Sequence, residues 1–117
     1  MINRKIIQKQ QALDAIQNGE FESSIISSKD RVVIVLTQDW CPQWQNMKSW
    51  IYESTDADID IYELEYNKED YSDEFRSFKE EKLGNEYVPY LRFYKNGVLI
   101  EETNFISKDR FVSIIGE

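Results

Sequence analysis

Histidine is absent from this chain of 117 residues, and cysteine occurs once, at Cys41. The lack of histidine removes the commonest general base and the commonest metal ligand, and it excludes Ser–His and Cys–His catalysis within one chain. A single cysteine can form neither an internal disulfide nor a cysteine-rich zinc site. We therefore expect no metal centre and no cofactor, and any thiol chemistry must use Cys41.

Basic residues are few, because 14 Lys and Arg stand against 22 Asp and Glu and leave a net charge of -8. Nucleic-acid binding is driven largely by basic side chains that release counterions, so this charge argues against a nucleic-acid partner. The same charge disfavours anionic membrane surfaces. The simplest interpretation of the acidity is solubility.

Long apolar runs are also missing, and none approaches the ~20 residues of a membrane span. The N-terminal segment has no apolar core of the kind found in a signal peptide, so the cytoplasm is the expected location. The length suits one domain, and a hydrophobic content of 41% suits a globular core. We expect a single soluble domain over residues 1–117, in which residues 1–19 form an N-terminal helical extension.

Hydrophobic periodicity predicts five helices and four strands in the order α-α-β-α-β-α-β-β-α. The predicted helices cover residues 5–18, 21–28, 42–53 and 71–83, and a last segment capped by Ser107. The predicted strands cover residues 32–36, 59–66, 90–94 and 98–102. Asn96-Gly97 predicts a type I′ hairpin between the last two strands. A right-handed β-α-β crossover then gives an α/β fold with a mixed sheet and helices on both faces.

Three features stand at definite places in this layout. The segment Trp40-Cys41-Pro42-Gln43-Trp44 follows a strand predicted to be buried and opens a helix, for which Pro42 is a favourable first residue. Val88-Pro89-Tyr90 leads into a later strand, and Phe93-Tyr94-Lys95-Asn96-Gly97 forms the hairpin. In order and spacing they resemble the W-C-x-x-C motif, the cis-proline and the F-x-x-G hairpin of the thioredoxin family. The resemblance runs from about residue 20 to the end and implies a thioredoxin-like fold with a cis bond before Pro89.

The departures from the family pattern fall at functional positions. Trp44 stands where the family has its resolving cysteine, and Val35 stands where many members bury an acid. Asn104 replaces the glycine that follows the last strand. Reduction of a protein disulfide needs a second thiol to release the product from the mixed disulfide. A self-sufficient dithiol cycle is therefore excluded.

Two functions stay open, and the first is thiol–disulfide redox homeostasis with Cys41 as the nucleophile. An external thiol, for example glutathione, would resolve the mixed disulfide with a protein or peptide. The position of Cys41 at a helix N-terminus favours the thiolate, whereas Asp39 and the net charge oppose it. The alternative is an inert, half-buried thiol. An exposed Cys41 would also link two copies into a dimer on oxidation.

The second function is a non-catalytic module that binds an extended peptide or a partner protein. Aromatic anchors dominate such contacts, and the backbone before a cis-proline can pair with an added strand. The residues assigned to binding are Trp40, Pro42, Gln43, Trp44, Val88 and Pro89. Trp44 has an alternative role as ordinary core. A buried Cys41 sulfur favours the binding module, and an exposed one beside Pro89 favours redox chemistry.

Acidic residues alternate with apolar ones along residues 58–66. On a strand, each of the pairs Asp58/Asp60 and Glu63/Glu65 would share a face. Such acids are usually solvated, so we expect an exposed face rather than a metal or acid–base site.

Overall fold

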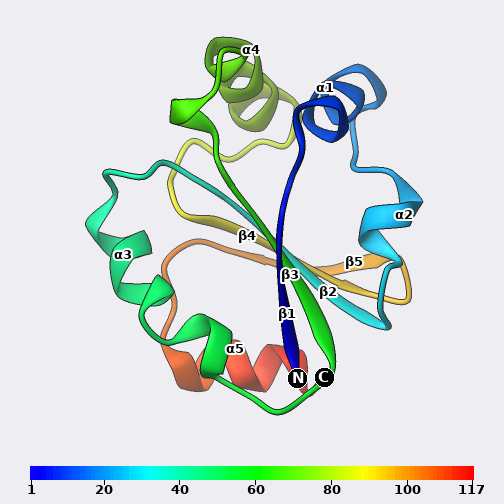
Figure 1. Ribbon diagram of the computed structural model, residues 1–117, viewed down its shortest axis with the longest axis vertical. Coiled ribbons are helices and arrows are strands. Elements are labelled where there is room, and N and C mark those ends of the chain that lie inside the picture. Colours follow the sequence, from blue (N-terminus) through cyan, green and yellow to red (C-terminus); the bar gives the residue numbers. More distant parts are fainter.

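The computed structural model describes residues 1–117 and contains one mixed sheet of five strands in the order β1-β3-β2-β4-β5 (Figure 1). The strands are β1 (Ile2–Ile6), β2 (Arg31–Thr37), β3 (Ile59–Glu65), β4 (Tyr90–Lys95) and β5 (Val98–Thr103). The pairs β1–β3 and β3–β2 are parallel, and the pairs β2–β4 and β4–β5 are antiparallel. The α/β class and the mixed sheet are confirmed.

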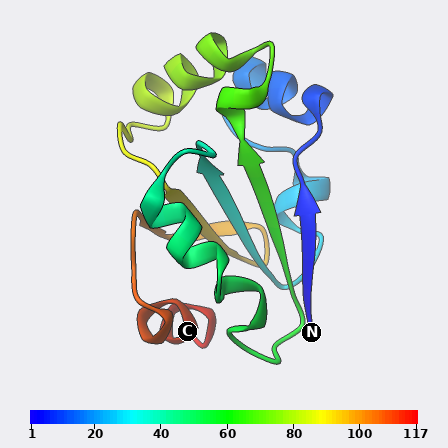
Figure 2. The same cartoon turned by 60° about the vertical axis from the view of Figure 1, so that its left-hand side comes forward.

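Helices cover both faces of this sheet (Figures 1 and 2). They are α1 (Lys9–Asn18), α2 (Ser23–Ile26), α3 (Pro42–Lys48), α4 (Ser72–Ser77) and α5 (Lys108–Ile115). Short 3-10 turns lie at Ile51–Glu53 and Tyr66–Lys68, and a π-helical segment, η3 (Phe78–Lys82), extends α4. One buried cluster joins the sheet to α1, α2 and α4, and a second joins it to α3 and α5. None of the helices has the length and apolarity needed to cross a membrane.

The elements with strong local signals form as predicted. Strand β2 is buried from Val32 to Thr37 because it lies between β3 and β4 and is covered on both faces. Asn96 and Gly97 have φ values of 51° and 78°, as the predicted hairpin turn requires. Ser107 caps α5 by accepting a hydrogen bond from a backbone N–H in its first turn.

The N-terminal segment differs from its prediction, because residues 2–6 form an edge strand instead of belonging to a helical extension over residues 1–19. This strand raises the total from the expected four to five. It has no alternating apolar pattern and therefore no hydrophobic strand signal. Its polar side chains bind acids of β3 instead: Asn3 Nδ2 donates to Asp60 at 3.0 Å, and Arg4 Nε donates to Glu63 at 2.6 Å.

The acids of β3 are buried, so the predicted solvated face is wrong for three of the four residues. Asp60 is 0% exposed, Glu63 2% and Glu65 9%, and only Asp58 lies at the surface. Strand β3 lies between β1 and β2 under helices on both sides, which leaves neither face to solvent. Each buried carboxylate is paired with a cation, in Lys5–Asp60, Arg4–Glu63 and Lys68–Glu65.

Candidate functional site

Cys41 lies between the end of β2 and the start of α3. It is the N-cap residue of α3, with extended backbone angles, and Pro42 is the first helical residue. The residue is only 4% exposed. Its Sγ donates to the carbonyl oxygen of Val88 at 3.6 Å, and the Val88–Pro89 peptide bond is cis. The single thiol therefore lies against the backbone that precedes the cis-proline.

A cavity of about 440 Å³ opens beside this thiol, and we refer to it as the Cys41 cleft. Its lining includes Trp40 and Pro42 on one side and Tyr87 and Val88 on the other. Trp40 is 61% exposed and Tyr87 is 70% exposed. Exposed aromatic side chains beside a concave surface are typical of binding sites.

The loop that carries Trp40 is held by polar contacts with the 3-10 turn Tyr66–Lys68, which follows β3. The indole Nε1 of Trp40 donates to Gln38 at 2.5 Å, and Gln38 Nε2 donates to the hydroxyl of Tyr66 at 3.1 Å. Asp39 and Asn67 exchange two hydrogen bonds, at 2.9 and 2.6 Å. This wall of the cleft is therefore preorganised, which reduces the entropy that binding would cost.

Trp44 is a core residue and not part of the cleft surface, so its assignment to binding is wrong and its alternative role is the one observed. It is 0% exposed, and its Nε1 donates to Glu65 at 2.8 Å. Glu65 also binds Lys48 at 3.3 Å and Lys68 at 2.9 Å. Burial by itself raises the pKa of Glu65, but the bonds from these three side chains outweigh it and lower the pKa to about 2.

Apart from the start of α3, which Cys41 caps, the side chains around Cys41 do not include the usual partners of a redox thiol. Val35, at the position of the family's buried acid, is a fully buried apolar residue. Glu65, at the end of the adjoining strand β3, has a pKa of about 2, which keeps it ionised and unable to donate a proton near neutral pH. Lys48 is paired with Glu65 and not with the sulfur. The sulfur itself donates to the carbonyl oxygen of Val88 and to no catalytic side chain.

The structure brings most of the predicted site residues together. Trp40, Cys41, Pro42, Gln43 and Val88 all line the cleft, whereas Pro89 is buried and does not line it. Six further lining residues were not predicted: Gln38, Tyr66, Arg76, Glu80, Glu86 and Tyr87. Of these, only Tyr87 had a usable signal, because it directly precedes Val88-Pro89.

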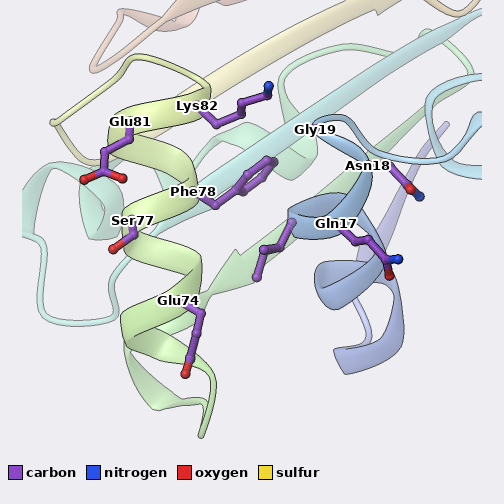
Figure 3. A pocket seen from close by; sticks show the side chains of 9 residues that line it. Gln17, Asn18, Gly19, Glu74, Ser77, Phe78, Glu81 and Lys82 are labelled. Atoms are coloured by element: carbon purple, nitrogen blue, oxygen red, sulfur yellow. The ribbon is translucent and has the colours of Figure 1, made fainter.

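A second and larger hollow, of about 530 Å³, lies between the end of α1 and the helical segment α4–η3 (Figure 3). Polar residues dominate its lining, and Ile16 and Phe78 are its only apolar members. It contains none of the residues predicted for function. The candidate site is therefore the Cys41 cleft.

Solved structures similar to this chain are thioredoxins. A mutant thioredoxin from Halobacterium salinarum NRC-1 is 22% identical with a TM-score of 0.63, and the match covers 97% of this chain and 88% of the other. Oxidised thioredoxin O2 from Arabidopsis thaliana is 18% identical with a TM-score of 0.69, over 97% and 91% of the two chains. Oxidised thioredoxin from Plasmodium falciparum is 19% identical with a TM-score of 0.62, over 97% and 96%.

The protein therefore has the thioredoxin fold over nearly its whole length. No protein-family model and no curated protein sequence matches the chain.

Proposed function

We propose that this protein is a thioredoxin-fold binding module of the cytoplasm, which holds an extended segment of a partner protein in the Cys41 cleft. The burial of the Cys41 sulfur against the Val88 carbonyl carries this proposal, because a thiol in that state is a poor nucleophile. The exposed rings of Trp40 and Tyr87 supply apolar contact area on the two sides of the cleft. The backbone of Val88 supplies an edge for β-strand addition.

The test begins with a cysteine-free peptide selected from a random library on the native protein. Isothermal titration calorimetry then measures its affinity for variants. Cys41→Ser should leave the affinity within about twofold, and Trp40→Ala should lower it by at least about thirtyfold, as expected for an aromatic hot spot. Phe105→Ala is the matched control, since Phe105 is 45% exposed but does not line the cleft. Loss of all binding in Cys41→Ser would overturn the proposal.

A second candidate function is monothiol exchange, which is favoured by the place of Cys41 in the cleft at the start of α3. The Cys41 thiolate would attack a partner disulfide, form a mixed disulfide and release the other partner sulfur as a thiolate. One glutathione thiolate would then attack the Cys41 sulfur and release the reduced partner. A second glutathione would free Cys41 as oxidised glutathione forms, so two glutathiones reduce one disulfide.

Insulin reduction in the presence of glutathione tests this second function. Turnover that requires glutathione and disappears in Cys41→Ser would support it. A Cys41 pKa near the ordinary thiol value of about 8.5, with no turnover above that of glutathione alone, would exclude it.

A further inference from the structure

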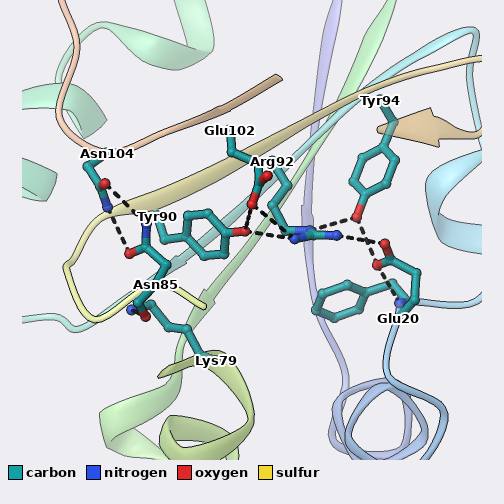
Figure 4. Close-up of polar contacts among 9 residues, drawn as sticks. Glu20, Lys79, Asn85, Tyr90, Arg92, Tyr94, Glu102 and Asn104 are labelled. Carbon is teal, nitrogen blue, oxygen red and sulfur yellow. Dashed lines mark hydrogen bonds and ion pairs between the residues drawn. The ribbon is translucent and has the colours of Figure 1, made fainter. Parts of the chain in front are cut away.

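The second wall of the Cys41 cleft is a loop, residues 84–89, between η3 and β4. It carries Tyr87 at the rim and Val88 against the sulfur. Unlike the wall around Trp40, it is held by side chains from both before and after it in the sequence (Figure 4). These side chains are Lys79, which precedes the loop, and Asn104, which follows it, and both bind Asn85 within the loop.

Asn104 links the end of β5 to both ends of this loop. Its Nδ2 donates to Asn85 Oδ1 and to the carbonyl oxygen of Pro89, each at 3.0 Å. Asn85 Nδ2 returns a bond to Asn104 Oδ1 at 3.1 Å, and Asn85 Oδ1 also accepts from the backbone N–H of Tyr87 at 3.0 Å. A glycine at position 104, as in the family pattern, could make none of the side-chain bonds.

Lys79 holds the same loop from inside the protein. Its side chain is 0% exposed, and its Nζ donates to the carbonyl oxygen of Asn85 at 2.9 Å. The backbone N–H of Asn85 donates back to the carbonyl of Lys79 at 3.2 Å. The ammonium also lies 5.7 Å from the ring centre of Tyr90. Burial of an ammonium group costs free energy unless the group forms hydrogen bonds. The bond to the Asn85 carbonyl is therefore important for keeping Lys79 buried.

We propose that Lys79, Asn85 and Asn104 are positioning residues, which hold the loop 84–89 against Cys41 and so control how often the thiol and the Val88 backbone become accessible. The inference concerns the same cleft as the proposed function, and its relevance to partner binding rests on that function. Its physical basis is separate, because the burial of the sulfur depends on Val88 staying in place.

The charge on Lys79 adds a pH dependence to this arrangement. Burial lowers the pKa of Lys79 to about 8, with Glu80 and Glu86 opposing that change and Arg76 adding to it. From β4, the ring of Tyr90 faces the ammonium. Near pH 7 the protonated amine therefore donates a charge-assisted bond to Asn85, and above about pH 8 the neutral amine donates a weaker one.

The single cysteine is a built-in reporter for this inference. Dithiobis(nitrobenzoate) reacts with an accessible thiolate: the Cys41 sulfur forms a mixed disulfide with the reagent, and one coloured thionitrobenzoate leaves. In the native protein the rate measures how often the sulfur is uncovered. Low urea concentrations distinguish local opening of the loop from global unfolding as the cause of thiol exposure. The modification rate through local opening is nearly independent of urea, whereas the rate through global unfolding rises with the full m-value.

Asn104→Ala removes three hydrogen bonds that hold the loop. Because the loss of each bond should raise the equilibrium constant for loop opening by a factor of about 2 to 12, we expect the urea-independent rate to rise by at least about tenfold. Asn104→Asp, which keeps the size of the side chain but removes its donor, should raise the rate as well. The control is Asn46→Ala, an exposed residue of α3 outside the cleft lining. An unchanged rate in both Asn104 variants, or a rate with the full urea dependence, would overturn the inference.

Lys79→Met gives a readout that a merely structural role would not produce. The substitution removes a buried charge, so the urea midpoint of global unfolding should stay the same or rise. The rate of Cys41 modification should nevertheless increase by about 2- to 12-fold, because the loop loses one bond. A rate that falls in parallel with the gain in global stability would contradict a positioning role for Lys79. The assay needs no partner, so its failure is distinguishable from failure of the proposed function.

Discussion

Replacing Trp44 by phenylalanine tests why a tryptophan occupies the position of the resolving cysteine. Phenylalanine keeps an aromatic ring in the core but removes the indole N–H that binds Glu65 at 2.8 Å. Lys48 and Lys68 stay bound to the carboxylate. The variant therefore isolates one hydrogen bond to a buried charge and a small loss of volume.

The expected loss of unfolding free energy is about 3 kcal/mol near neutral pH. A hydrogen bond to a charged group contributes about 1.5–3 kcal/mol, and the smaller ring adds about 1 kcal/mol through the cavity it leaves. Glu65 has its pKa lowered to about 2 in the folded protein, so its ionised form contributes stability above the ordinary pKa. That contribution is lost as the pH falls toward 2, and the hydrogen-bond part of the Trp44→Phe effect must shrink with it.

Urea unfolding followed by far-ultraviolet circular dichroism, at pH 7 and at about pH 3, measures both parts of this effect. Trp50→Phe is the matched control, because the Trp50 ring packs edge-on against Phe111 at 5.8 Å and its N–H makes no hydrogen bond. The loss in Trp44→Phe should be larger than in the control at pH 7, and the difference between the two variants should be smaller at pH 3. Equal losses in the two variants at both pH values would refute the assigned role of the Trp44–Glu65 bond.

Three further predictions concern stability. Glu65→Gln should flatten the acid limb of a stability–pH curve measured by urea unfolding, since the native protein loses about 3 kcal/mol from this carboxylate between about pH 5 and pH 2; an unchanged slope would contradict it. Gly97→Ala should cost about 1–2 kcal/mol in the same assay, because φ is +78° and the new Cβ would lie 2.5 Å from Ser27 Oγ; full stability would show that the turn can relax. Arg92→Met should lower the unfolding free energy by about 3 kcal/mol, because the buried guanidinium binds Glu20 at 2.7 Å; a loss below about 1 kcal/mol would mean that the network is dispensable.

The elements predicted correctly are those whose stabilisation is local or purely apolar. Strand β2 follows from a run of aliphatic residues, the hairpin from Asn96-Gly97, and the last helix from its cap at Ser107. The start of α3 follows from Pro42. In each case the residues that determine the conformation are neighbours in the chain, so the pattern can be read without knowing the fold.

The elements that were missed depend on partners far along the chain. Strand β1 is polar, and its side chains bind acids more than fifty positions away, as in Arg4–Glu63. The same ion pairs offset the cost of burying the β3 acids. The missed strand β1 and the wrongly predicted solvated face of β3 therefore have one cause. Trp44 could be assigned to surface or core only once the position of Glu65 beside it was known. Tyr66 and Arg76 reach the cleft only through the packing of their elements.

The absence of a dithiol cycle was determined by the sequence alone, because Trp44 carries no thiol and the chain has no second cysteine in any fold. Only the tertiary structure decided the state of the remaining thiol. Strands β2 and β4 pair antiparallel with Leu36 opposite Tyr90, which brings the segment after β2 to the segment before β4. Cys41 is buried against Val88 for that reason, since the contact depends on strand order rather than on either segment's own residues.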